Sequence, residues 1–415
     1  MTKEVVTIKE KKTSLSVANT AITAVLRSNT QKTGIRLYDN DCLGIAGAIG
    51  AYNDNELTNR AKHMLNFKLP YNAVPTENAV RSVDLSGKLT VSDEEFVAMA
   101  RKLMEVLREK YPKFSFSHKV ELIEIEESLV NDKGTNLVHK DRYIDVQLMY
   151  KHKDSKSLMD GGGGIDARAM DFDTILHEIS KTCGPYEEKI DFSEAGEMIP
   201  VVVMSYWTFG MKFITDLSAD MFAMGASLFS GKTGQKLFSD DFSLAVNRNP
   251  ERIYTRFFDG EGVVLPDDKF YLIENGVLKS PYTNKRTAKQ YNLPISGSAH
   301  LEHDSAPGAS PWGIAVLPGQ KTIKELLGGK KAILVVMASG GDFTPQGEYA
   351  SPIQVAYMFD GEKILGRLPQ LSMTSHVNDM FGKDFIGMSS DGPYVGAANT
   401  YLAVNMNVKK TNSWM

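Results

Sequence analysis

Cysteine is scarce in this sequence of 415 residues, which contains only Cys42 and Cys183. Two cysteines cannot build the disulfide framework of a small secreted domain, and such sparse usage is typical of a reducing compartment. An excess of charge of either sign is also missing, because 47 Lys and Arg face 51 Asp and Glu, for a net charge of −4. That balance gives no electrostatic reason to expect a nucleic acid as partner. We therefore expect a cytoplasmic protein that binds no nucleic acid.

Long apolar runs are absent as well. The two longest, IPVVVM at residues 199–204 and AILVVMA at residues 332–338, have the length of a strand, whereas a membrane-spanning helix needs about 20 apolar residues. The N-terminal stretch MTKEVVTIKEKK lacks the apolar segment of a secretory signal. The sequence therefore predicts no membrane partner.

A phosphate-binding loop is missing, although GKT at residues 231–233 has the ending of one. Such a loop needs a glycine five residues before its last glycine and follows a buried strand, but Ala226 occupies that position. The preceding apolar residues recur at helical spacing, at Leu217, Met221, Met224 and Leu228. They predict a helix that starts at Asp216 or Ser218, covers residues 217–229 and contributes its methionines to the core.

β-Structure is predicted at two places in the first half of the chain. Residues 1–50 contain β-branched segments broken by polar turns at residues 29–31 and 39–41. A hairpin follows, with residues 118–128 as one strand and the alternating YIDVQLMY at residues 143–150 as the other. The alternation places on one face Ile144, Val146, Leu148 and Tyr150.

Three helices are also predicted in this half. The first covers residues 55–67. The second starts at Ser92, which forms a capping box with Glu95, and its buried face consists of Phe96, Ala100, Leu103 and Leu107. The third covers residues 171–185 and is closed by the Gly-Pro pair at its end.

The connection between the two halves is polar and rich in glycine. Four consecutive glycines at residues 161–164 cost much backbone entropy to order and predict a mobile turn. The charged segment YEEKIDFSEAGEM at residues 186–198 separates the predicted helices from strand-rich sequence. We therefore expect two domains, residues 1–194 and residues 195–415.

Side chains that could catalyse a reaction form no familiar motif. His177 and Glu178 lie on a predicted helix that has no second histidine one turn later, so this helix lacks the ligand pair of a zinc peptidase. No G-x-S-x-G nucleophile elbow occurs either. The loop at residues 296–308 departs from the inverted zinc motif H-x-x-E-H, but it brings together His300, Glu302, His303 and Asp304. Residue chemistry alone leaves the function open.

The order of segments in the second half is more informative. It runs through FSGKTG at 229–234, DGEGV at 259–263, residues 272–299, LPGQKTIKELL at 317–327, residues 339–364 and SHVNDMFGKDF at 375–385. This succession resembles the TldD/PmbA family, peptidase-associated proteins once called modulators of DNA gyrase. TGIRLYDNDCLGIAGAI and the hairpin around ESLVNDKGTNL are similar to the first domain of that family. The resemblance implies an α+β protein of two domains, an N-terminal mixed α/β-strand domain and a β-rich C-terminal domain of the metallopeptidase scaffold type.

The zinc ligands of the family are missing from this sequence. Members of the TldD type carry H-E-x-x-x-H on the helix before the glycine-rich turn and a cysteine near the C-terminus. The corresponding helix, residues 216–231, contains neither histidine nor glutamate, and in FIGMSSDGP at residues 385–393 Ser389 or its neighbour replaces the thiol. The resemblance therefore implies the PmbA or TldE-like branch, with no metal ligand or catalytic residue in this chain and zinc held by a TldD-type partner subunit.

From this we predict a non-catalytic subunit of a TldD-type metallopeptidase complex that shapes the chamber or presents peptide, as a heterodimer or a homodimer. The candidate peptide-binding residues are His300, Glu302, His303, Gly340, Gly341 and Asp342. The two glycines permit close backbone approach, and extended peptides bind by strand addition, although a tight structural turn accounts for them equally well. Two other functions stay open: an autonomous hydrolase with a loop site around His300 and His303, and a homo-oligomeric peptide-binding scaffold.

Overall fold

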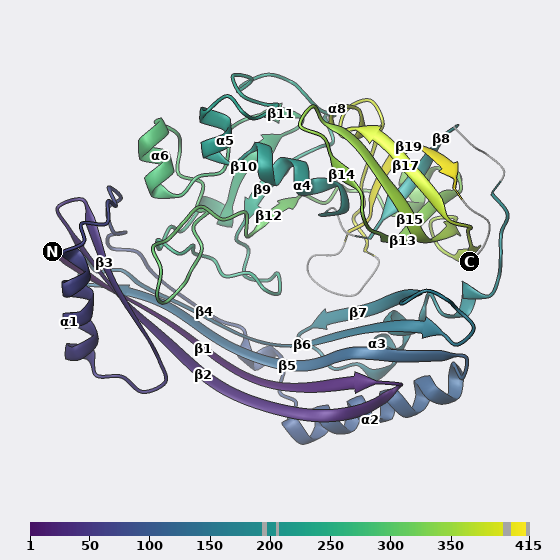
Figure 1. The fold of residues 1–415 in the computed structure, drawn as a ribbon, viewed down its shortest axis with the longest axis horizontal. Helices are drawn as coiled ribbons and strands as arrows, with labels where there is room; N and C mark the ends of the chain where they lie inside the picture. Colours follow the sequence, from purple (N-terminus) through teal and green to yellow (C-terminus); the bar gives the residue numbers. More distant parts are fainter. Residues whose placement is uncertain (193–196, 205–206, 393–399, 412–415) are drawn as a thin grey trace.

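The chain folds into two stacked parts, a long curved sheet from the first half and a β-rich domain from the second half (Figure 1). The computed structural model describes residues 1–192, 197–204, 207–392 and 400–411. Helices and strands are mixed and strands predominate, which confirms the predicted α+β class. The predicted domain boundary at residues 194 and 195 falls outside the described residues. None of the helices in the described ranges is both long and apolar enough to cross a bilayer.

The first half forms one sheet with the strand order β3-β2-β1-β5-β6-β4, and β7 pairs beside β4 on the outer edge of β6. Only β4 is parallel to its neighbour. The strands are β1 (Thr2–Ala18), β2 (Ala21–Asp39), β3 (Cys42–Ile49), β4 (Val80–Asp84), β5 (Phe114–Asn131), β6 (Asn136–His152) and β7 (Gly161–Ala167). The helices are α1 (Asp54–Leu65), α2 (Asp93–Lys110) and α3 (Phe172–Ser180), with short 3₁₀ turns at Ser86–Lys88 and Gly184–Tyr186.

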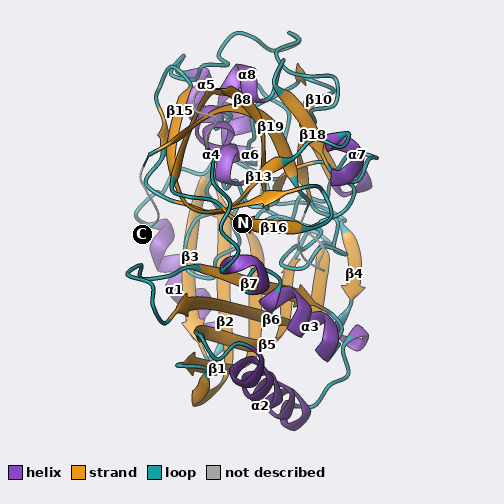
Figure 2. Cartoon of the chain, turned by 90° about the vertical axis from the view of Figure 1, so that its right-hand side faces the viewer, coloured by secondary structure: helices purple, strands orange, loops and turns teal. Residues whose placement is uncertain are grey.

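The outer face of this sheet packs on α2 and α3, with α2 on the side away from the second half (Figures 1 and 2). α2 begins with the predicted capping box of Ser92 and Glu95. The predicted apolar faces of the hairpin and of α2 are buried in one cluster, which contains Ile144, Val146, Leu148, Tyr150, Phe96, Ala100, Leu103 and Leu107. These predictions are confirmed. They could be made from the sequence because long amphipathic elements have the clearest periodicity.

The turn predicted at residues 29–31 is wrong. β2 runs through these residues without interruption and pairs with β1 along its length. The chain reverses instead at Asn19 and Thr20, whose φ angles are 49° and 57°. The turn predicted near residue 40 has the same form, with φ of 48° at Asn40 and 57° at Asp41. Two consecutive left-handed residues form the two-residue turn whose twist suits a hairpin.

Five strands of the second half close into a barrel, in which β13, β8, β19, β17 and β15 pair in that order and β15 pairs again with β13. A second sheet has the order β11-β10-β9-β12. The strands are β8 (Glu197–Val203), β9 (Leu244–Asn247), β10 (Lys269–Glu274), β11 (Val277–Leu278), β12 (Ile314–Val316), β13 (Ala332–Ala338), β14 (Asp342–Phe343), β15 (Glu348–Phe359), β16 (Ile364–Arg367), β17 (Leu371–His376), β18 (Phe385–Met388) and β19 (Leu402–Lys410). The helices are α4 (Trp207–Asp216), α5 (Ala219–Ala223), α6 (Lys285–Tyr291), α7 (Ile323–Leu327) and α8 (Val377–Met380), and Pro266–Asp268 is a 3₁₀ turn.

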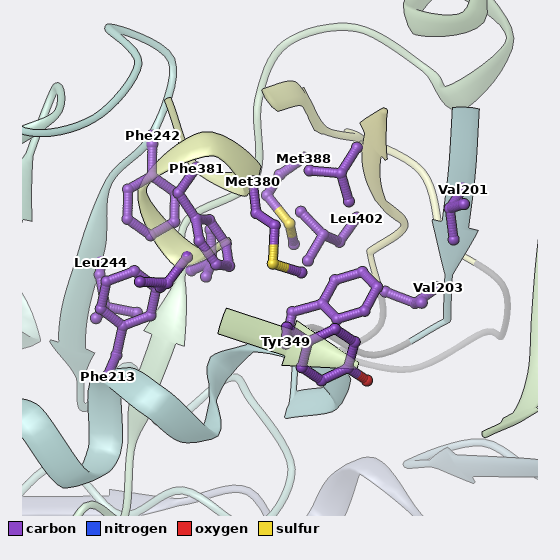
Figure 3. Packing of buried hydrophobic residues seen from close by; sticks show 14 of the residues in the cluster. Val201, Val203, Phe213, Phe242, Leu244, Tyr349, Met380, Phe381, Met388 and Leu402 are labelled. Carbon is purple, nitrogen blue, oxygen red and sulfur yellow. The ribbon is translucent and has the colours of Figure 1, made fainter. Parts of the chain in front are cut away.

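The helix α4 fills one side of the core of the second half. Phe209, Phe213 and Leu217 recur at intervals of four and are fully buried. The rings of Phe213 and Phe381 have centroids 4.8 Å apart, and Figure 3 shows them within a cluster of apolar side chains. Local sequence patterns do not predict this helix, because the aromatic and β-branched residues of WTFGMKFITD favour a strand.

The helix predicted over residues 217–229 is much shorter than expected. α5 is a short helical segment, and Gly225 follows it with φ of 73°, a left-handed conformation that ends the helix. Met224 is 71% exposed, so the predicted methionine stripe is not part of the core. The ammonium of Lys232 donates to the Leu228 carbonyl at 2.7 Å, so this side chain stabilises the glycine-rich turn.

Candidate functional site

A groove of about 390 Å³ lies between the inner face of the N-terminal sheet and the barrel. The sheet contributes residues of β5, β6 and β7, and the barrel side contributes the end of β8, the start of α4 and β13. In Figure 1, β7 is the strand of the sheet drawn nearest to the barrel, and β13 lies across from it. The groove is lined by His118, Gln147–Met149, Met159, Gly161–Gly164, Asp166, Met204, Thr208 and Val335–Met337.

The four glycines form the start of β7 and not the mobile turn that the sequence predicts. Residues 161–167 pair antiparallel with β6. Gly163 faces the outer core, where a Cβ atom would lie 2.6 Å from the carbonyl oxygens of Glu178 and Ile179. Gly162 and Gly164 alternate with it and face the groove. Gly163 is therefore explained by close packing against α3, which a local sequence pattern cannot show because the neighbours are remote in the chain.

One edge of β7 is open. Its inner edge pairs with β6, and no second strand among the described residues pairs with its other edge. That edge faces β13, so the groove runs along a row of unpaired backbone N–H and C=O groups. An edge of this kind can pair with an extended segment of another chain. The missing side chains at Gly162 and Gly164 leave room above it.

His118 enters the groove through a distorted backbone. The alternation of side chains along β5 would place the His118 side chain on the outer face, where Phe116 and Val120 are buried. Its φ of 117° is one that residues with a side chain rarely adopt, and the exposed imidazole lines the groove instead. Strained backbone at a groove is a frequent mark of a functional site.

Two carboxylates lie side by side on the inner face of the sheet, and one of them, Asp166, lines the groove. Asp145 on β6 and Asp166 on β7 are directly opposite each other in the register. Burial and the nearby charge of Asp145 raise the pKa of Asp166 to about 6. Tyr254 contacts this pair: its hydroxyl bonds to Asp145, and its ring packs against Tyr143 at 5.0 Å between centroids. Neither carboxylate is among the residues predicted from sequence; the only available signal was the alternation of polar residues along β6.

The residues around α4 do not fit a catalytic zinc ion. A catalytic site needs three protein ligands, usually histidine, glutamate or cysteine, and residues 207–231, which include the segment 216–231 predicted from the resemblance, contain none of these types. Ser389, at the predicted cysteine position, is buried and accepts a hydrogen bond from the Tyr401 backbone N–H at 2.9 Å. Its hydroxyl donates to the Asp391 carbonyl, so Ser389 links Asp391 to Tyr401.

The loop with the predicted histidine cluster packs against the N-terminal sheet. Glu302, His303 and Asp304 do approach one another closely enough to hold a metal, but His303 is only 8% exposed and its backbone lies against Gly34 of β2. His300 accepts a hydrogen bond from the Gly308 N–H at 3.0 Å and so closes the loop on itself. Their role as substrate contacts stays a prediction.

A buried arginine anchors this loop. Arg36 on β2 is fully buried, lies 3.2 Å from the Glu4 carboxylate and donates to the carbonyls of Gly260 and Glu302, the latter at 2.9 Å. The neighbouring Glu261 accepts from the Tyr71 hydroxyl. Burial raises the pKa of Glu261 to about 7. The loop thus belongs to a polar contact between the two halves of the chain.

The other predicted segment is a tight turn between β13 and β15. Gly340 has φ of 85°, a left-handed conformation that favours glycine. The backbone of Gly341 lies so close to Ser351 that no side chain fits. Asp342 is exposed and pairs with Ala350 as part of β14. Gly340, Gly341 and Asp342 are not among the residues that line the groove, and their role in binding stays a prediction.

Comparison with solved structures shows the same fold in three proteins. The chain is similar to a proposed modulator of a DNA gyrase from Thermotoga maritima, with a TM-score of 0.81, 17% identity, and 98% and 96% of the two chains covered. It is also similar to TldE from Thermococcus kodakarensis, with a TM-score of 0.75 and 16% identity over 98% and 96% of the chains. A third, a proposed modulator of DNA gyrase from Bacteroides thetaiotaomicron, has a TM-score of 0.77 and 14% identity over 99% and 95% of the chains.

Sequence comparison finds relatives that match a smaller part of the chain. An uncharacterized protein of Methanocaldococcus jannaschii is 23% identical over 57% of this chain and 56% of its own length. A metalloprotease of Methanothermobacter thermautotrophicus is 26% identical over 42% of this chain and 38% of its own length. The matches thus span about half or less of these curated relatives. The model of the PmbA/TldA metallopeptidase C-terminal domain matches residues 197–409, half of the chain, and the chain belongs to the TldD/PmbA family.

Proposed function

We propose that the chain is a non-catalytic, peptide-binding subunit of a TldD-type metallopeptidase complex. The observation that carries this proposal is the open, glycine-rich edge of β7 beside a groove. An extended peptide added to this edge pairs its backbone with β7, as in other strand-addition complexes. Gly162 and Gly164 leave space for its side chains, so binding depends mainly on the peptide backbone and tolerates many sequences.

The lack of metal ligands supports the non-catalytic part of the proposal. Met204 and Thr208 line the groove where β8 leads into α4, so this helix starts beside the bound peptide. Its sequence offers neither histidine nor glutamate to activate a water molecule. Hydrolysis then requires a metal-bearing relative, and this chain contributes a wall of the chamber and a strand that holds the peptide extended.

Peptide binding is tested by fluorescence anisotropy with labelled extended peptides and the full-length chain. We expect Gly162→Val to abolish binding, because the new side chain fills the groove while its Cβ makes only a close contact, 3.1 Å from the Leu148 carbonyl. Glu105→Gln, on the exposed face of α2, is the matched control and keeps the wild-type affinity. Equal affinity of Gly162→Val and wild type would place the peptide elsewhere.

The partner is tested by the metal content and the activity of the purified chain. Untagged, chelator-free protein is expected to contain far less than one zinc ion per chain, and to support peptide cleavage only when mixed with a zinc-bearing relative. Stoichiometric zinc together with chelator-sensitive cleavage by the chain alone would instead identify an autonomous hydrolase. Recovery of homodimers that bind peptide and never associate with a metallopeptidase would favour a scaffold.

A further inference from the structure

None of the lysines and arginines in the described ranges lines the groove. Arg168, the nearest arginine in sequence to Asp166, is engaged with Asp141 through two contacts of 2.7 Å, and it also donates to the carbonyls of Pro250 and Glu251. Asp141 is completely buried, so this pair is a fixed part of the structure. Arg168 therefore acts on the charge of Asp166 only from a distance.

The carboxylate of Asp166 is buried, and no cation among the described residues forms an ion pair with it. It is 8% exposed and lines the groove, and within the described chain its only hydrogen bond comes from its own backbone N–H. One oxygen of Asp145 is likewise buried without a hydrogen-bond partner in the described part of the chain, although Tyr254 bonds to this carboxylate. Opposite residues of an antiparallel pair have Cβ atoms about 5 Å apart, so both carboxylates can reach one group.

The register of β7 sets which part of a bound peptide meets these carboxylates. Asp166, Gly164 and Gly162 share one face of β7, opposite Asp145, Gln147 and Met149 of β6. A strand added to the free edge places one side chain opposite Asp166 and the next two side chains on that face opposite the glycines. The first of these meets two acids, whereas the other two meet glycines, which offer no side chain to contact.

We propose that Asp145 and Asp166 form an acidic subsite that binds a lysine or arginine side chain of the extended peptide. This inference rests on the proposed function, because it assumes that the peptide adds to β7. Buried charges without a partner are costly, and a cationic side chain inserted beside Tyr254 supplies the missing partner. The subsite gives one fixed position of an otherwise sequence-tolerant groove a preference for positive charge.

A lysine scan of an uncharged, N-acetylated host peptide tests the subsite on the full-length chain. Each lysine peptide is compared with its norleucine analogue, which has the same length without the charge. We expect one position at which lysine tightens binding by about tenfold or more, equivalent to 1.4 kcal/mol. This preference disappears in Asp166→Asn and persists in Glu105→Gln. Equal binding of lysine and norleucine at every position, with the host peptide still bound, overturns the subsite and leaves the proposed function intact.

Two further arms distinguish the subsite from a folding defect and from a metal site. In Asp166→Lys, a host peptide with glutamate at the preferred position is expected to bind more tightly than its lysine counterpart, which a folding defect cannot produce. Asp145→Asn gives a second test if Asp166 variants fold poorly, with circular dichroism as the check. A lysine preference abolished by millimolar magnesium or calcium would assign the carboxylates to a metal ion and overturn the proposal. If no host peptide binds at all, the proposed function itself fails.

Discussion

Two polar regions lie where the N-terminal sheet meets the second half of the chain: the loop at residues 300–304 and the groove beside β7. They differ in how their charges are matched. Around the loop, Arg36 is paired with Glu4 and bonded to two backbone carbonyls. In the groove, Asp166 forms no ion pair among the described residues, and Arg168 acts on its charge only from a distance. Matched polar groups join two parts of a protein, whereas a buried unmatched group points to a ligand.

The largest expected effect concerns the loop. Arg36→Met leaves the Glu4 carboxylate fully buried without its cation, and breaking such a pair costs roughly 3–5 kcal/mol. We therefore expect a loss of this size in the free energy of unfolding, measured by urea titration. Arg27→Met is the control, because the ion pair of Arg27 with Asp93 is largely exposed and contributes little. A stable Arg36 variant with altered peptide affinity would show instead that the loop binds substrate.

The two faces of the glycine run give the next contrast. Gly163→Ala forces a Cβ atom into two carbonyl oxygens of α3 at 2.6 Å, and overpacking of this kind costs about 1–3 kcal/mol. Gly162→Ala projects into the groove and is expected to change stability by less than about 1 kcal/mol, since the removal of a glycine also restricts the unfolded chain. Equal losses in thermal unfolding of the two variants would contradict the assignment of the faces.

The unmatched carboxylate predicts a pH dependence of stability. The pKa of Asp166 is about 6 in the folded chain against 3.8 for an ordinary aspartate, so the folded state binds the proton more tightly. The contribution of this proton to the free energy of unfolding is complete below pH 3.8. It is lost as the pH rises through 6, by roughly 3 kcal/mol at most. Asp166→Asn should flatten this part of the curve of unfolding free energy against pH, whereas the neighbouring Asp145 and Arg168 are the same in both proteins. An unchanged curve would contradict the raised pKa.

The smallest expected effect is that of substitutions in the loop at residues 300–304 on peptide affinity. His300→Ala combined with Glu302→Ala alters residues outside the groove, so peptide affinity is expected to stay within about twofold of wild type, well below the 1.4 kcal/mol of a tenfold change. Anisotropy titrations with the same peptides measure this. A loss of tenfold or more would restore the loop as the substrate site and weaken the case for β7.

Much of the fold could be predicted from local patterns, because the hairpin of β5 and β6 and the helix α2 have long, regular periodicity and a defined cap. Elements shaped by contacts between distant residues could not. Gly163 of β7 is required by its contact with α3, and α4 is helical because Phe209 and Phe213 enter a core built from remote strands. The same limit applies to the site: His300 and His303 are conspicuous in sequence, whereas Asp145 and Asp166 become neighbours only through strand pairing.

The closed barrel has a consequence for the order of events during synthesis. Its strand β8 pairs with β19, which is the last strand of this domain to be made. All strands of the N-terminal sheet precede residue 168, so this sheet can assemble on the ribosome well before the barrel closes. During that interval the free edge of β7 is exposed to any nascent strand nearby. The edge of β7 is therefore formed before the barrel beside it can close.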